Sequence, residues 1–210
     1  MRAVLAWFAA CVAVGPLLAA QDRTPEAVLA ERWPRATIVR REIPLGEAEL
    51  AAIETRAGTR PERAVCFRYD VRIDGAVVAR GYTEVHRVRT LREALFVVVG
   101  ADGRIAAVDV LAFAEPRTFA PRARFLAQFV GRRLDDDLQS GRGIDGMTGA
   151  TLTTRAVVGG ARRALATDAV ITARDGSHPP DPVPPPSREP VERGTEIRKP
   201  ESNRGRGTAR

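Results

Sequence analysis

Four threonines lie close together in the segment GIDGMTGATLTT, which spans residues 143–154. They are Thr148, Thr151, Thr153 and Thr154. Apolar residues at helical spacing follow them, so the threonines are expected at the N-terminus of a helix. The first turn of a helix offers unpaired backbone N–H groups and the positive end of the helix dipole, which both favour an anion. Because Gly149 and Ala150 are small enough for a ligand to approach the backbone, the segment predicts a phosphate site.

A structural explanation of the same segment stays open: one threonine is the N-cap of the helix, and the others lie at the surface. Two nucleotide-binding motifs are excluded. The segment lacks the Gly-Lys-Ser/Thr ending of a Walker loop, and its glycines do not have the spacing of the dinucleotide-binding fingerprint. A phosphate bound here is therefore bound in another way.

The sequence is poor in residues for other chemistries. It has four serines, three of them after residue 176, and two histidines, His86 and His178. These few residues make a Ser-His-Asp or Cys-His catalytic site unexpected. His86 is expected to be a structural residue of a strand. The acidic run Asp135–Asp137 lacks the alternating oxygen ligands of a calcium loop, so no metal site is predicted.

Residues 1–20 have the pattern of a secretory signal peptide: one arginine, an apolar run and small residues before a polar stretch. An uncleaved anchor is the alternative, because Leu18 stands where cleavage after Ala20 prefers a small residue. We therefore expect an exported protein, periplasmic or bound to the outer face of the inner membrane. Loss of this segment leaves Cys66 as the single cysteine, and we expect it to pack in the core.

Residues 176–210 contain eight of the 15 prolines, mixed charges and few apolar side chains, so we expect a disordered tail or a docking segment. The formal net charge is +7, but 33 basic and 26 acidic residues are spread along the chain. This spread indicates a bias towards arginine and no nucleic-acid partner. Residues 21–175 remain as one domain with a helical extension at its N-terminus.

The rest of the sequence predicts the elements that position the threonines. Thr24 is expected as the N-cap of a short helix that starts at Pro25. A strand over residues 36–43 and a helix over residues 46–58 follow. Residues 65–88 alternate apolar and polar side chains around a turn at Asp74-Gly75, which predicts a half-buried hairpin.

A second hairpin is predicted over residues 94–113, with its turn at residues 100–103. An amphipathic helix that contains Phe125 and Phe129 comes next and ends near Gly131. The helix of the threonine segment follows, and residues 168–176 are predicted as a last strand. This order predicts an α+β fold, an antiparallel sheet built from hairpins with helices packed on one face or end.

The segment Asp145 to Thr153, with the sequence DGMTGATLT, resembles the flavinylation signature of the FMN-binding domain family. This domain occurs in flavin-carrying subunits of the sodium-pumping and Rnf-type respiratory complexes and in exported flavoproteins. The signature is an Asp, two residues, Ser/Thr-Gly-Ala-Ser/Thr, any residue and a Thr, and every specified position is filled here. The resemblance extends over about residues 81–165 and includes the segments AFAEP and FLAQFVG.

The resemblance implies that Thr153 carries FMN through a phosphoester, attached from FAD by a separate flavin transferase that uses a divalent metal. Asp145 would be recognised by the transferase, and Gly149, Ala150 and Thr151 would allow approach and donate to the phosphate. Thr148 and Leu152 complete the predicted cofactor site. Glu115, in the acidic-proline segment, is a candidate contact of the flavin ring, and a strand end followed by a turn is the equally good structural explanation.

The function that follows is an electron carrier between a membrane-bound redox donor and an extracytoplasmic acceptor, more than a self-standing catalyst. Arg89 is expected near the ring, where it would stabilise the reduced anionic flavin. Residues 89–95 depart from the glycine-rich loop of respiratory-complex subunits, which indicates a stand-alone or differently partnered carrier. The alternatives are a flavin-dependent reductase of a small substrate and a non-redox binding module.

Overall fold

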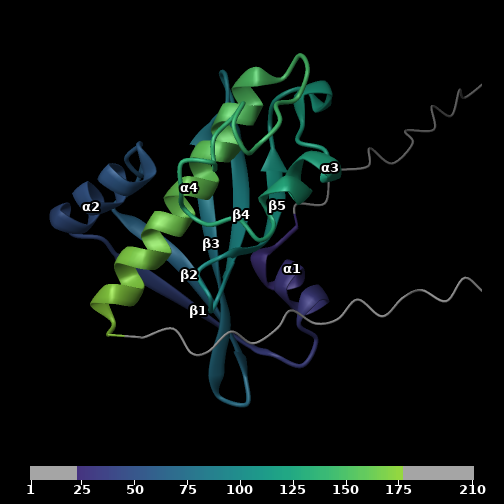
Figure 1. Ribbon diagram of the computed structural model, residues 1–210. Helices are drawn as coiled ribbons and strands as arrows, with labels where there is room; N and C mark the ends of the chain where they lie inside the picture. The colour runs from purple at the N-terminus through teal and green to yellow at the C-terminus, as the bar shows by residue number, and fades with distance from the viewer. Residues whose placement is uncertain (1–22, 177–210) are drawn as a thin grey trace, which may run out of the picture.

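The structure is a computed structural model that describes residues 23–176. The predicted signal peptide and most of the predicted tail lie outside the described residues. The described chain contains five strands and four α-helices (Figure 1), which confirms the predicted α+β class. The strands are β1 (Thr37–Pro44), β2 (Val65–Ile73), β3 (Ala76–Arg87), β4 (Arg92–Gly100) and β5 (Ile105–Phe113).

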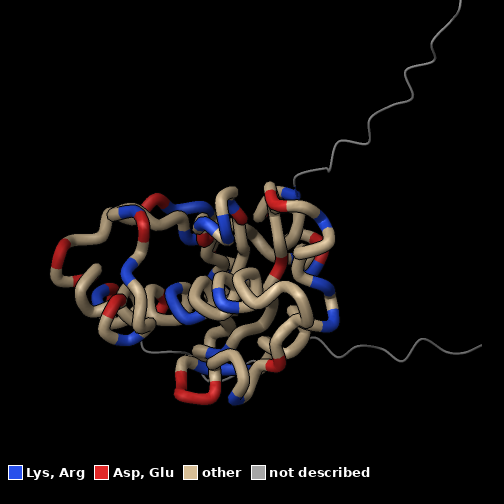
Figure 2. Tube along the Cα trace, turned by 90° about the horizontal axis from the view of Figure 1, so that it is seen from above, with Lys and Arg blue, Asp and Glu red and all other residues tan. Residues whose placement is uncertain are grey.

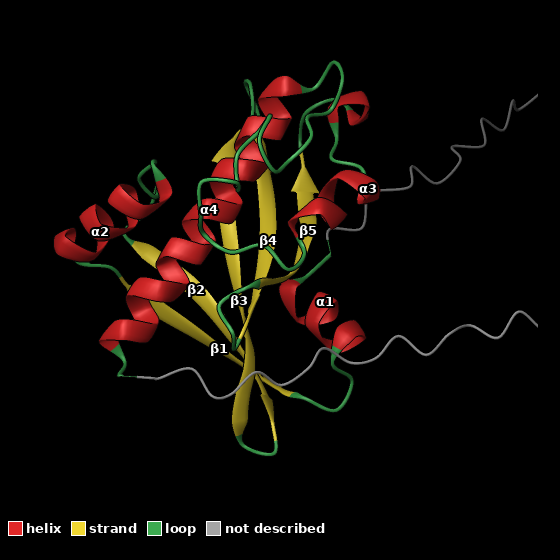
Figure 3. Ribbon diagram, in the orientation of Figure 1, coloured by secondary structure: helices red, strands yellow, loops and turns green. Residues whose placement is uncertain are grey.

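The five strands form one sheet in the order β1-β2-β3-β4-β5, and each pairs antiparallel with its neighbour in the sequence (Figure 3). The predicted turns explain this topology. Asp74 and Gly75 have φ angles of 50° and 82°, the left-handed conformation that a tight two-residue hairpin requires. The hairpin at residues 100–103 turns through Gly103, whose φ is 73°.

Helices cover both faces of the sheet. Helices α2 (Glu47–Ala57) and α4 (Thr151–Arg174) pack together on one face, where α4 runs across the strands (Figure 1). The core of this face contains Tyr82, Leu95 and Val97 of the sheet and Val157, Ala161 and Ala164 of α4. The short helix α1 (Pro25–Arg32) closes the opposite face through Val28 and Leu29. Its N-cap is Thr24, as predicted, and α2 ends at Gly58, also as predicted.

The predicted last strand is wrong, because residues 168–174 belong to α4. The β-branched residues Val170, Ile171 and Thr172 favoured a strand. Tertiary contacts override this preference: Ile171 is fully buried against the sheet, and Asp168 accepts a hydrogen bond from the Tyr82 hydroxyl at 2.8 Å.

The predicted amphipathic helix is also interrupted. It consists of α3 (Ala123–Leu126) followed by a 3-10 turn at Ala127–Phe129, and another 3-10 turn at Arg117–Phe119 precedes it. Phe125 and Phe129 are buried, as the pattern predicted, and Gly131 ends the segment with a φ of 80°. The exposed fraction of Val130 is 55%, so the apolar stripe stops at Phe129.

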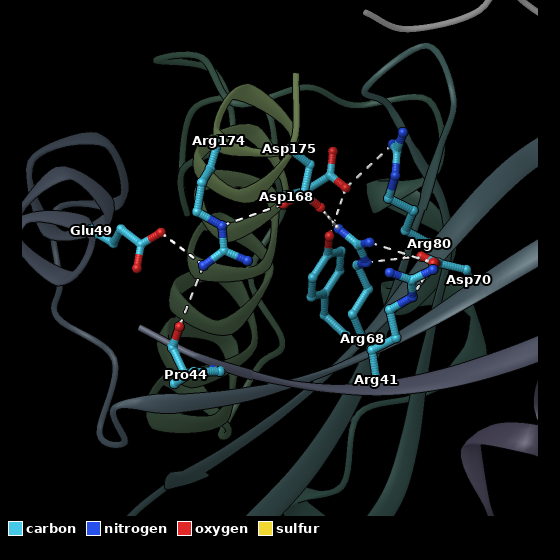
Figure 4. A network of polar contacts seen from close by, with 10 residues as sticks. Arg41, Pro44, Glu49, Arg68, Asp70, Arg80, Asp168, Arg174 and Asp175 are labelled. Atoms are coloured by element: carbon cyan, nitrogen blue, oxygen red, sulfur yellow. Dashed lines mark hydrogen bonds and ion pairs between the residues drawn. The ribbon is translucent and has the colours of Figure 1, made fainter. Parts of the chain in front are cut away.

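A buried polar network fixes the C-terminal end of α4 to the sheet (Figure 4). Arg68 of β2 contacts Asp70 at 2.8 Å and Asp175 at 3.0 Å. Arg80 of β3 lies 3.5 Å from Asp168, whose pKa is raised by burial against the opposing effect of Arg80. The position of α4 on the sheet is thus set by directional contacts at one end, and the candidate site lies at the other.

Cys66 and His86, whose side chains could be reactive, are both packed as structural residues. Cys66 packs against the core, as expected, and burial raises the pKa of its thiol to about 12. The Nε2 atom of His86 lies 3.1 Å from a carboxylate oxygen of Glu93, and both side chains are buried between the sheet and α4. His86 is therefore the sheet histidine that the sequence predicted.

Basic and acidic residues alternate around the outline of the molecule in the view from above (Figure 2). Among residues 23–176, none of the helices combines the length and the apolar character needed to cross a membrane.

Candidate functional site

The threonine segment forms the entrance of α4, as predicted. Helix α4 begins at Thr151, and Ala150 occupies its N-cap position without a side-chain hydrogen bond to the first turn. The alternative interpretation of this segment, in which one threonine is the N-cap of the helix, is therefore wrong. Gly149 has a φ of 76°, a conformation that side-chain-bearing residues rarely adopt, so a glycine is needed directly before this entrance.

The four threonines have different surroundings. Thr148 and Thr151 are exposed, whereas Thr153 and Thr154 each have an exposed fraction of 1%. The Thr154 hydroxyl accepts a hydrogen bond from the Met147 backbone N–H at 3.1 Å and donates one to the Ala150 carbonyl at 3.2 Å. Thr154 is thus a structural residue that ties the loop to the helix. Within residues 23–176, the Thr153 hydroxyl has no hydrogen-bond partner.

The loop before α4 is fixed by side chains of the preceding segment. The Gln128 side chain accepts a hydrogen bond from the Asp145 N–H at 2.8 Å and donates one to the Asp145 carbonyl at 3.3 Å. Arg132 donates to the Gly143 carbonyl at 2.8 Å, and Ile144 is fully buried. These contacts involve the backbone of Asp145, and the residue itself is exposed, so its carboxylate is accessible to another molecule.

A hollow of about 700 Å³ lies beside this loop. One wall comes from residues 118–128 and includes Arg122, Arg124 and Gln128, and the other comes from residues 145–150 and includes Asp145, Thr148 and Ala150. The volume is within the range of small-molecule sites, about 300–1,000 Å³. Three predicted site residues, Asp145, Thr148 and Ala150, are therefore brought together at one cavity. Thr153 lies one helical turn beyond Ala150 and does not line it.

The remaining predicted residues are placed as follows. Gly149, Thr151 and Leu152 are exposed at the entrance of α4, and the exposed fraction of Leu152 is 45%. Arg89 lies with its guanidinium 5.5 Å from the centre of the Phe119 ring. Because Thr118, the neighbour of Phe119, lines the hollow, Arg89 lies near its rim without lining it.

Glu115 fastens the turn between β3 and β4. One carboxylate oxygen accepts hydrogen bonds from the backbone N–H groups of Leu91 at 2.9 Å, Thr90 at 2.8 Å and Arg89 at 3.2 Å. These backbone donors lower the pKa of Glu115. Its observed contacts agree with the structural explanation weighed from the sequence, a strand end and a turn, and it does not line the hollow.

Sequence reasoning missed Arg122, Arg124 and Gln128. Gln128 carried a weak signal, because it is a polar residue inside the otherwise apolar run FLAQF. The two arginines carried none, since arginine is the common charged residue of this chain and no pattern distinguishes these two.

Comparison with known proteins supports a cofactor site here. Residues 93–166 match the family model of the FMN-binding domain, a range that includes both walls of the hollow and the entrance of α4. The comparison with curated proteins gave no match. In the part of the chain that the structure describes, no group of three or more His, Cys, Asp or Glu side chains could hold a metal ion. Residues 93–166 therefore resemble the FMN-binding domain, and this match supports a flavin-binding protein.

Proposed function

We propose that this protein is an exported electron-transfer flavoprotein that carries FMN through a phosphoester to Thr153. The observation that carries the proposal is the position of the signature residues. They form the entrance of α4, which no side chain caps, directly beside a hollow with the volume of a small-molecule site.

The residues at the entrance fit a phosphate group. The N-cap residue Ala150 leaves the backbone N–H groups of the first turn without a side-chain partner, and the helix dipole adds to their attraction for an anion. Gly149 and Ala150 keep the approach free of bulky side chains. Arg122 and Arg124 on the opposite wall add positive charge to the same cavity.

Bound FMN supplies the redox chemistry, because its ring system accepts and returns electrons. The protein holds the cofactor and sets its surroundings. In this proposal the hollow takes the ring, and the entrance of α4 takes the phosphate. A covalent bond would keep the cofactor on a protein that works outside the cytoplasm, where released FMN is lost.

Attachment requires access to the Thr153 hydroxyl, which is 1% exposed as a residue. The side chains that cover Thr153 therefore have to move aside while the flavin transferase acts. In the transfer, Thr153 Oγ1 would bond to the phosphorus of the FMN half of FAD, and AMP would leave. The hydroxyl proton would pass to the transferase, since Thr153 has no hydrogen-bonded base among residues 23–176.

The signal-like residues 1–20 support export, and an extracytoplasmic transferase would then meet the protein in the same compartment. We propose a membrane-bound donor and an extracytoplasmic acceptor as redox partners.

The experiment is to produce the chain with a flavin transferase in a bacterial periplasm and to measure the intact mass. The wild type and Thr153→Ser, which keeps a hydroxyl, should gain the mass of one FMN phosphoester, and Thr153→Ala should not. Circular dichroism of Thr153→Ala checks that the variant is folded. An unmodified wild type, or a modified and folded Thr153→Ala, would overturn the proposal. The N-terminal residue of the purified protein shows whether residues 1–20 are removed.

A further inference from the structure

The wall of the hollow that precedes α4 is strongly basic. Residues 114–133 contain five arginines and one acidic residue, Glu115. The carboxylate of Glu115 is engaged by three backbone N–H groups of the β3–β4 turn, so it does not form an ion pair with these arginines.

Two arginines line the hollow and two more lie next to residues of its wall, and we call the four the arginine rim: Arg89, Arg117, Arg122 and Arg124. All four are exposed, and within residues 23–176 none forms an ion pair with a carboxylate. Arg122 and Arg124 line the hollow itself, Arg117 directly precedes the lining residue Thr118, and Arg89 stacks on Phe119.

The charge balance of this wall differs from that of the whole chain, where 33 basic residues are mixed with 26 acidic ones. Among residues 23–176, ten other arginines form ion pairs with carboxylates and eleven others form none, so the rim is distinguished by the clustering of its arginines around one site. At the hollow, the acidic residue among the lining side chains is Asp145, against Arg122 and Arg124. Unpaired like charges around a concave site repel one another, and they focus a positive potential on the site. Such an arrangement does not stabilise the fold, which indicates a role in attracting an anion.

We propose that the arginine rim is the docking surface for a redox protein whose contact face is acidic. The inference rests on the proposed function, because an electron partner has to approach the flavin at the mouth of the hollow. Complementary charge gives fast, transient encounters without a large interface, which suits a carrier that must release its partner after each transfer. A lipid surface on the same arginines would cover the mouth and exclude the partner.

The first test measures the potential at the mouth with small oxidants. The flavinylated protein is photoreduced with EDTA as the electron donor and is then mixed in a stopped-flow instrument with anionic ferricyanide or with cationic hexaammineruthenium(III). Each oxidant takes one electron, so two are consumed for each fully reduced flavin, which releases its protons to water. We expect the ferricyanide rate to fall between about 0.01 M and 1 M salt, where the Debye length shrinks from about 30 Å to 3 Å, and the rate with the cation to rise.

The double variant Arg122→Gln, Arg124→Gln should lower the ferricyanide rate about tenfold at low salt, the lower end of electrostatic steering effects. It should raise the rate with the cation. Opposite changes identify an effect of charge, whereas a changed flavin potential would move both rates in the same direction. The matched control is Arg35→Gln, Arg56→Gln, which removes two exposed arginines that do not line the hollow. Equal rates in the three proteins would overturn the inference.

The second test does not need FMN, so it separates a failure of this inference from a failure of flavinylation. Binding of an acidic plant-type ferredoxin and of basic cytochrome c to the unmodified chain is measured at low salt. The inference requires that ferredoxin binds, that cytochrome c does not, and that the rim variant loses most of the ferredoxin affinity while the control keeps it. No binding of ferredoxin, or stronger rim-dependent co-sedimentation with phosphatidylglycerol vesicles, would overturn a protein partner.

Discussion

Replacing Gly160 by alanine adds one methyl group at a place where α4 lies close to His86 of β3 and Leu95 of β4. The new Cβ atom would lie 3.1 Å from His86 Cε1 and 3.1 Å from Leu95 Cδ2, and both distances are shorter than the ordinary contact range of 3.4–4 Å. Neither neighbour can withdraw easily. Leu95 is fully buried, and His86 is held by its contact with Glu93 at 3.1 Å.

The adjacent Gly159 provides the matched control. A Cβ atom there would meet the Arg163 guanidinium at 3.4 Å, an ordinary contact with the end of a flexible side chain. Alanine is favoured over glycine in a helix interior by about 1 kcal/mol, and this gain applies to both positions of α4. Gly159→Ala should therefore stabilise the protein by about 1 kcal/mol.

At position 160 the same gain is opposed by overpacking, which costs about 1–3 kcal/mol in a well-packed core. We expect Gly160→Ala to destabilise the protein by about 1 kcal/mol. The difference between the two variants cancels the helix preference and isolates the packing cost. Urea unfolding measures both free energies, and each kcal/mol corresponds to a Tm change of about 2–4 °C for a domain of this size.

A double-mutant cycle tests the cause. Leu95→Ala removes one of the two contacts, so its cost should be smaller in the Gly160→Ala background than in the wild type, by about 0.5–3 kcal/mol. Equal stabilisation by Gly159→Ala and Gly160→Ala would refute the close approach of α4 to the sheet, and with it the placement of His86 beneath the helix.

Two further predictions follow from the titrating groups. Because backbone N–H groups lower the pKa of Glu115, its ionised form stabilises the fold above the ordinary carboxyl pKa of about 4.3, and this contribution is lost as the pH falls through the lowered value. The wild type should therefore have a higher urea midpoint than Glu115→Gln at pH 7. The two midpoints should begin to approach each other as the pH falls below about 4.3 and should converge only below the lowered pKa. A difference that does not change with pH would contradict this account. Burial raises the pKa of the Cys66 thiol to about 12. In a Cys11→Ser background, a thiol reagent at pH 8 should therefore label the native protein about a thousandfold more slowly than the urea-unfolded protein. Equal labelling rates would show that Cys66 is accessible in the native protein.

The sequence predicted those parts of the fold that local chemistry decides. The turn at Asp74-Gly75 and the helix end at Gly58 depend on glycine in a left-handed conformation, a signal carried by the residue itself. The strand predicted over residues 168–176 failed because a buried helix and a buried strand look alike in a short apolar run. The burial of Ile171 in the core decides between them, and that core is formed by residues far away in the chain.

The candidate site also has a part that could be predicted from the sequence and a part that could not. The signature is contiguous, so its place at the entrance of α4 could be predicted. The hollow is formed by two segments about twenty residues apart, and nothing in the sequence shows that Arg122 and Arg124 face Asp145 across it. The burial of Thr153 could not be predicted from the sequence either, because a threonine at the start of a helix is usually exposed.

The antiparallel order of the sheet has a consequence for how this protein can be divided. The range that matches the family, residues 93–166, begins inside β4, whose whole length pairs with β3 outside that range. A fragment cut at these limits would leave the backbone N–H and C=O groups on one side of β4 unpaired, and it would separate Glu93 from His86. It would also end α4 at Ala166 and remove the buried Ile171 from the core. The range that matches the family model, residues 93–166, is thus smaller than the folded unit of residues 23–176. Only the larger unit could be transplanted into another protein.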